Sequence, residues 1–184
     1  MPPPAPARAT PHSVWATAQR TAALLNVLSA PRPDVDEVGD VLRAHGETDP
    51  LHLTDADVAA MRAVAGRLRA VFAAHDLEDV VRALNHLLAA CPGPIRLTSH
   101  EGDSPWHLHL DGHDDAEWGE WFLASSTLAL AVLVADRQIR PGGACAAPGC
   151  ESVFASERSG STRRFCSRRC ATRDRVAAHR RRAR

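Results

Sequence analysis

Four of the five cysteines lie within 26 residues near the C-terminus, in two pairs spaced C-x4-C and C-x3-C, with 15 residues between the pairs. That separation is typical of zinc sites with four cysteine ligands. A segment this short cannot fold on buried apolar surface alone, whereas a bound metal ion supplies the missing folding free energy. We therefore expect one structural Zn²⁺ ion, held by Cys145, Cys150, Cys166 and Cys170.

Other chemistries of clustered cysteines remain open at this point, namely redox-active thiols and disulfide-bonded pairs. A catalytic zinc site is not expected, because four cysteine ligands leave no coordination position for water or substrate.

The charge of the chain changes sign just before these cysteines. Residues 1–140 hold 11 arginines and 19 acidic residues, a net charge of −8, whereas residues 141–184 hold 11 arginines and 3 acidic residues, a net charge of +8. Such asymmetry indicates a basic appendage that binds a polyanion, and guanidinium groups suit phosphate. A solvated basic tail is the alternative. The candidate nucleic-acid contacts are Arg163, Arg164, Arg168, Arg169, Arg173, Arg175, Arg180, Arg181 and Arg182.

The first half of the chain has the pattern of an amphipathic helical body. Apolar residues recur at helical spacing, and the segment "LTDADVAAM" contains a capping box from Thr54 to Asp57. We expect four helices, over residues 13–30, 34–46, 54–75 and 76–91.

The pattern then changes to polar and apolar alternation in "IRLTSH" and "WHLHLD", which predicts a β-hairpin. A long helix follows, capped by Asp114 and running to about Arg137. Its apolar stretch, residues 121–135, is too short to span a bilayer, so we expect a buried helix and no membrane association.

The expected fold class is α+β, with a mostly helical body and a small β-hairpin over residues 13–139. After a linker at 140–143, a four-cysteine zinc module completes residues 140–184 and ends in an arginine-rich helix capped by Ser167. Residues 1–12 are proline-rich and lack an apolar signal core, so we expect a disordered lead-in and a cytoplasmic protein.

The segments "CAAPGC", "RRFCS", "CATR" and "AAHRRR" together resemble the bacterial CGNR zinc-finger family, in which such a module follows a helical ABATE domain. The similarity continues upstream through "LLNVLSAPRPD" and "VLRAHG". The family is regarded as stress-induced transcriptional regulators, so the resemblance implies zinc binding and DNA binding. The motif that names the family reads Cys170-Ala171-Thr172-Arg173 here and keeps only its first and last residues.

Three histidines are concentrated in "WHLHLDGHDD". On a strand, His107 and His109 project from the same face, and His113, with Asp111 or Asp114, could complete a metal or small-ligand pocket. A polar strand face at the rim of the body is the alternative.

The sequence contains neither a nucleophile elbow nor a glycine-rich phosphate loop, so we do not expect an enzyme. The favoured hypothesis is a transcriptional regulator that binds duplex DNA through its zinc module, while the body senses a small-molecule effector or forms a homodimer. A second hypothesis is an adaptor whose basic module docks on an acidic protein. The third is a metal-dependent enzyme that uses His107, His109 and His113.

Overall fold

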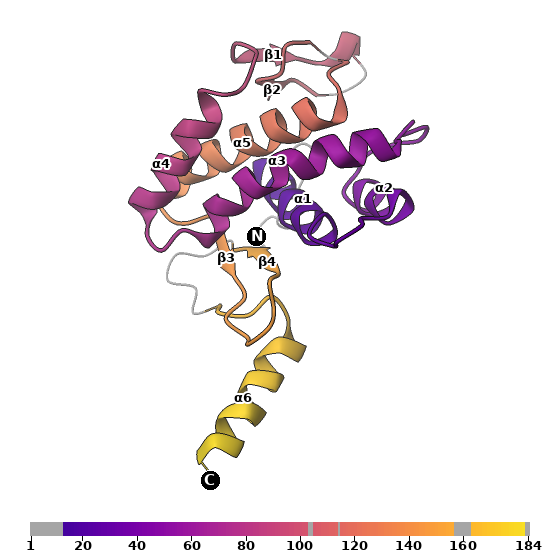
Figure 1. Cartoon of the computed structure of the whole chain (residues 1–184). Coiled ribbons are helices and arrows are strands. Elements are labelled where there is room, and N and C mark those ends of the chain that lie inside the picture. Colours follow the sequence, from indigo (N-terminus) through magenta and orange to yellow (C-terminus); the bar gives the residue numbers. More distant parts are fainter. Residues whose placement is uncertain (1–12, 103–104, 114, 157–162, 183–184) are drawn as a thin grey trace, which may run out of the picture.

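The computed structural model describes residues 13–102, 105–113, 115–156 and 163–182 (Figure 1). The predicted lead-in, residues 1–12, and the predicted helix cap Asp114 lie outside the described residues. A helical body carries one β-hairpin on one side and a second hairpin, followed by a projecting helix, on the other.

The four predicted helices of the body are all present. They are α1 (Val14–Val27), α2 (Val35–Ala44), α3 (Asp55–Ala73) and α4 (Leu77–Leu88). Each begins after a side chain that accepts a hydrogen bond from a backbone N–H of the first turn, where helical partners are missing. The predicted capping box is confirmed, because Thr54 and Asp57 each accept from the other's backbone N–H.

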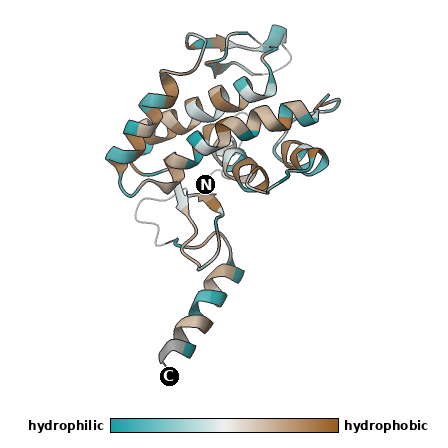
Figure 2. Cartoon of the chain, viewed as in Figure 1, coloured by the Kyte–Doolittle hydropathy of each residue, from teal (hydrophilic) through white to brown (hydrophobic). Residues whose placement is uncertain are grey.

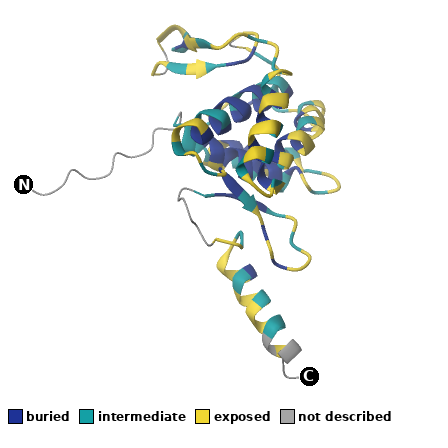
Figure 3. Ribbon diagram, turned by 90° about the vertical axis from the view of Figure 1, so that its left-hand side faces the viewer, coloured by how far each residue is buried: buried dark blue, intermediate teal, exposed yellow. Residues whose placement is uncertain are grey.

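Helix α5 (Trp118–Arg137) is the centre of the body and packs against α1, α3 and α4. It begins later than the cap predicted at Asp114, and Glu117 at its N-cap makes no side-chain capping bond. The helix is long and apolar enough to cross a membrane, but most of it is buried inside the body (Figures 2 and 3). A core helix has the same length and composition, as the sequence predicted.

The predicted hairpin consists of β1 (Arg96–Thr98) and β2 (His107–His109), paired antiparallel with Thr98 opposite His107 and Arg96 opposite His109. Side chains alternate between the two faces of such a ribbon. Leu97 and Leu108 are exposed on one face, and the histidines share the other face with the buried Thr98. This arrangement turns the histidines toward the helical body, where β2 packs on α5.

A second antiparallel hairpin, which the sequence did not predict, consists of β3 (Gly142–Ala144) and β4 (Val153–Ala155). The prediction of a linker over residues 140–143 is wrong for its second half, because Gly142 and Gly143 belong to β3. Position 142 requires glycine because there is no space for a side chain. A Cβ atom there would lie 2.0 Å from the carbonyl oxygen of Phe154 and 2.9 Å from the ring of Phe72.

The second hairpin is fastened to the body by burial and by hydrogen bonds. Val153 and Ala155 belong to the main apolar core, and β4 packs on α1. The Asn26 side chain donates to the carbonyl oxygen of Val153 at 3.0 Å and accepts from its N–H at 2.8 Å. Asn26 thereby satisfies the backbone groups of an edge strand as a neighbouring strand would.

Helix α6 (Arg168–Arg182) extends away from the rest of the protein (Figure 1). The hydroxyl oxygen of Ser167 accepts from the N–H of Cys170 at 3.2 Å, which confirms the predicted helix cap. Fifteen residues of helix extend about 22 Å.

Replacing Asn26 with alanine tests the attachment of β4. Asn26→Ala leaves both backbone groups of Val153 without their partner, so we expect the free energy of unfolding to fall by about 1 to 3 kcal/mol. Urea denaturation followed by circular dichroism measures this change. Asn85→Ala, at an exposed position of α4, is the matched control and should change the stability by less than about 0.5 kcal/mol. Equal effects of the two substitutions would contradict the attachment.

Candidate functional site

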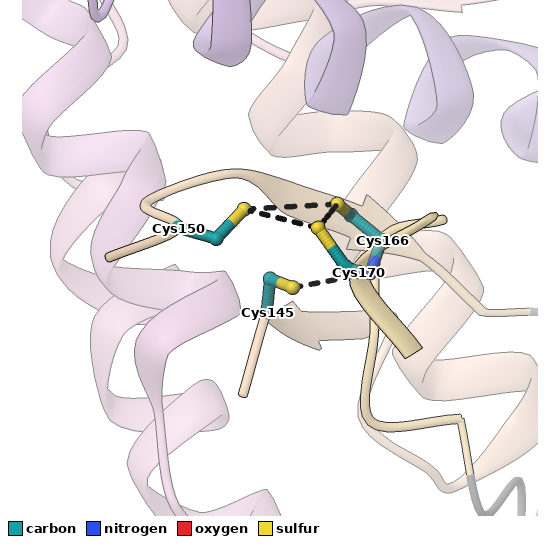
Figure 4. Close-up of side chains that lie close together, drawn as sticks. All are labelled: Cys145, Cys150, Cys166 and Cys170. Atoms are coloured by element: carbon teal, nitrogen blue, oxygen red, sulfur yellow. Dashed lines mark hydrogen bonds between the residues drawn. The ribbon is translucent and has the colours of Figure 1, made fainter. Parts of the chain in front are cut away.

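The four C-terminal cysteines converge on one point (Figure 4). The Sγ atoms of Cys150, Cys166 and Cys170 are separated by 3.6 to 3.8 Å, and the Sγ of Cys145 accepts from the N–H of Cys166 at 3.4 Å. All four sulfur atoms lie within 4.8 Å of one another.

These distances fit a metal site and not disulfides. A disulfide needs sulfur atoms about 2.05 Å apart, and all five cysteines are free. In a tetrahedral zinc site with Zn–S bonds of about 2.3 Å, neighbouring sulfurs lie about 3.8 Å apart. The cluster therefore has the donor set and the spacing of a closed four-thiolate site.

The pKa values of two of the thiols are shifted in opposite directions. Hydrogen bonds from the side chain and backbone of Ser152 lower the pKa of Cys150 to about 6. Desolvation and then the hydrogen bond with Cys170 raise the pKa of Cys166 to about 12. A thiol with a raised pKa keeps its proton near neutral pH, which is an obstacle to its binding a metal ion as a thiolate. A divalent cation removes that obstacle.

The turn between β3 and β4 and the start of α6 hold the four cysteines in place. Cys145 follows β3 and donates its N–H to the carbonyl oxygen of Ser152, and the chain then turns through Gly149, at φ 68°, to bring Cys150 back. A left-handed backbone of this kind favours glycine. Cys166 and Cys170 lie just before and within the first turn of α6, where helix N–H groups stabilise thiolates.

Arg163 serves the internal structure of the C-terminal zinc module, residues 140–184, which we call the finger. Its guanidinium donates to the carbonyl oxygens of Phe165 and Cys166 at 3.1 and 2.8 Å and stacks on the ring of Phe154 at 4.5 Å. We therefore leave Arg163 out of the nucleic-acid surface predicted from the sequence.

Most of the other predicted arginines lie on the outside of the finger. Arg164, Arg168, Arg169, Arg173, Arg175 and Arg180 are exposed, and the side chains of Arg181 and Arg182 lie outside the described residues. Arg169, Arg173 and Arg180 share one face of α6 at helical spacing. Among the described residues, no arginine of α6 is paired with a carboxylate of the body.

The histidines of the first hairpin form a second cluster, but its membership differs from the prediction. His107 and His109 lie together as expected, and the third member is His100, from the turn between β1 and β2. His113 instead pairs with Asp115 and is well exposed. The β1–β2 register was the missing information, because Thr98 opposite His107 brings the residues just after Thr98 to the same end of the ribbon.

A cavity of about 450 Å³ lies between the first hairpin and the helices. The histidine cluster lines it, as does Arg20, which is only 7% exposed. Arg20 pairs with Glu47 at 2.6 Å, donates to Ser125 at 3.0 Å and stacks on Trp121 at 4.3 Å. Its Nε is buried and has no hydrogen-bond partner among the described residues. The sequence analysis did not identify Arg20 as a buried residue, because it is a single arginine in a helix whose periodic residues are apolar.

Asp111 lies at the edge of this cavity and is almost fully buried. Burial raises its pKa, but the hydrogen bond and charge of His109 and the ion pair with Arg96 outweigh that effect and hold the pKa of Asp111 below its ordinary value. Asp111 is therefore a carboxylate. It contacts His109 Nδ1 at 2.8 Å and Arg96 Nη2 at 2.9 Å.

A helical body joined to a compact four-cysteine cluster defines a zinc-finger protein of two parts. Residues 143–183 match the CGNR zinc finger, and residues 23–137 match ABATE, the family described as "Putative stress-induced transcription regulator". The second match covers more than half of the chain, so this protein belongs to the ABATE family, and the resemblance seen in the sequence is confirmed. Neither description names an enzymatic activity. A comparison with curated proteins gives no match.

Replacing one cysteine tests the metal site. Cys166→Ser removes a thiolate ligand, so we expect the finger to lose its zinc ion and the order of β3, β4 and α6 to decrease. Mass spectrometry of the metal content and circular dichroism measure the two effects. Cys91→Ser is the matched control: this thiol lies on the body, its pKa is raised chiefly by burial, and its loss should leave the metal in place. Full zinc occupancy in Cys166→Ser would contradict the assignment.

Proposed function

We propose that this protein is a transcriptional regulator that binds duplex DNA through its finger. The main supporting observation is that α6 stands clear of the body and exposes a row of arginines beside the cysteine cluster. The major groove of B-form DNA is wide enough to admit an α-helix, and guanidinium groups bind phosphate and guanine edges.

In this proposal one structural Zn²⁺ ion is held by Cys145, Cys150, Cys166 and Cys170, and fixes the start of α6 relative to the second hairpin. The ion has no catalytic role, because the four thiolates fill its coordination sphere. The proposed phosphate contacts are Arg164, Arg168, Arg169, Arg173, Arg175, Arg180, Arg181 and Arg182.

The body, residues 13–139, would regulate the finger, residues 140–184. A cavity of about 450 Å³ with a buried arginine supports the detection of a small molecule, since ligand pockets combine apolar walls with few polar groups. Dimerisation, a cytoplasmic location and the absence of catalysis stay predictions. The adaptor hypothesis also stays open, and the DNA-binding experiment below distinguishes it from the regulator.

A salt series tests the DNA proposal. Fluorescence anisotropy of a labelled pool of random duplexes should show binding that weakens as salt rises, because each neutralised phosphate contributes about 0.9 to the slope of log affinity against log salt. Arg169→Gln/Arg173→Gln/Arg180→Gln should reduce that slope by about 2 to 3. Chelation of zinc should abolish the binding.

The matched control removes the same charge from the body. Arg62→Gln/Arg67→Gln/Arg82→Gln replaces three exposed arginines of α3 and α4 and should leave the slope unchanged. Equal losses in the two triple variants, or DNA binding that is indifferent to chelation, would contradict the proposal. Tight binding to acidic protein with weak retention of DNA would favour the adaptor hypothesis.

A further inference from the structure

We propose that His100, His107 and His109 form a second metal site, which binds a divalent transition ion such as Zn²⁺ through three Nε2 atoms and keeps one coordination position open to the cavity. This site lies in the body, apart from the cysteine cluster, and the inference does not depend on DNA binding. Its basis is the convergence of three imidazoles from a strand and the turn before it.

The spacing of the nitrogen atoms is close to that of metal ligands. His107 Nε2 lies 3.2 Å from His100 Nε2 and 3.0 Å from His109 Nε2, and the three atoms fall within 4.8 Å of one another. With Zn–N bonds of about 2.0 to 2.1 Å, tetrahedral geometry places neighbouring nitrogens about 3.3 Å apart. Small adjustments of the rings would therefore accommodate an ion between them.

The hydrogen bonds at the other ring nitrogens determine which atoms carry protons. His107 Nδ1 lies 2.7 Å from the carbonyl oxygen of Pro105, and a carbonyl only accepts, so the Nδ1 of His107 is the donor. His109 Nδ1 lies 2.8 Å from a carboxylate oxygen of Asp111 and is a donor for the same reason. In the neutral rings, both Nε2 atoms therefore present lone pairs.

Two lone pairs facing each other at 3.0 Å repel unless a proton or a metal ion lies between them. A metal ion held by both lone pairs resolves this conflict and uses the tautomers that the protein already imposes. A hydrogen bond from a ligating histidine to a carboxylate or a backbone carbonyl is the usual support of such sites. Asp111 and Pro105 provide these two kinds of support.

The supporting groups are themselves held in place. Asp111 is 2% exposed and is also bound by Arg96, which lies opposite His109 in the β1–β2 register. His100 has a left-handed backbone, at φ 48°, in the turn that carries it beside His107. Such a backbone is uncommon for a residue other than glycine and is enriched at functional sites.

Three protein ligands leave a zinc ion with room for a further ligand. All three histidines line the cavity, and helices α1 and α5 contribute Arg20, Ser125 and Trp121 to the same lining. A small anion with a donor oxygen, such as a carboxylate, suits both an open metal position and a buried guanidinium. The proposed site thus assigns a chemistry to the cavity in which we expect the effector to bind.

Metal content of the full-length protein tests the proposal. After reconstitution with excess Zn²⁺ and dialysis, mass spectrometry should find one ion fewer per chain in His107→Ala/His109→Ala than in the wild type. Cys150→Ser/Cys166→Ser should also lose one ion and keep the ion of the body. His113→Ala is the matched control, since it removes a nearby histidine outside the cluster, and should retain the wild-type content.

A second measurement does not depend on the folding of the histidine variant. Cys150→Ser/Cys166→Ser loaded with Co²⁺ should show visible d–d absorption without the thiolate-to-cobalt charge-transfer bands of a sulfur site. Adding acetate should change those d–d bands, because acetate would occupy the coordination position that the proposal leaves open. A metal-free double cysteine variant, or equal metal content in the wild type and His107→Ala/His109→Ala, would overturn the proposal, whatever the finger does with DNA.

Discussion

The insertion of β4 into the helical body is the contact on which the rest of the arrangement depends. Val153 and Ala155 complete the main core, and Asn26 of α1 satisfies the backbone of Val153 from the side. Complete burial of a valine side chain contributes about 1.5 to 3 kcal/mol. Because β3 pairs with β4, and Cys145 and Cys150 belong to the chain that joins them, the cysteine cluster has a fixed position on the body.

The sequence was most informative where local chemistry decides the structure. The helices were predictable because caps such as Thr54 and Asp34 are satisfied within a few residues, and the apolar periodicity that follows selects the buried face. The cysteine cluster was predictable because ligand spacing along the chain limits what a short segment can form. The start of α6 directly after Ser167 follows from the same kind of local rule.

Features that depend on distant partners were not predictable. The second hairpin contains only three residues in each strand, and β3 is glycine-rich, so neither strand has a distinctive pattern of its own. The role of Arg163 depends on carbonyl groups that only the folded finger brings together. Proximity in sequence favours His113 as the third member of the histidine cluster, whereas the turn and the strand register bring His100 there in space.

The packing of β4 also affects how such proteins can be recombined. Exchange of zinc-finger parts between relatives would ordinarily be attempted at a boundary between matched segments, which here falls between residues 137 and 143. A cut at that point would remove Val153 and Ala155 from the core and leave α1 and α3 with an uncovered apolar surface. In a chimera, the second hairpin and the body that it covers must therefore come from the same parent protein. A chimera that preserves both partners must join the chains after β4.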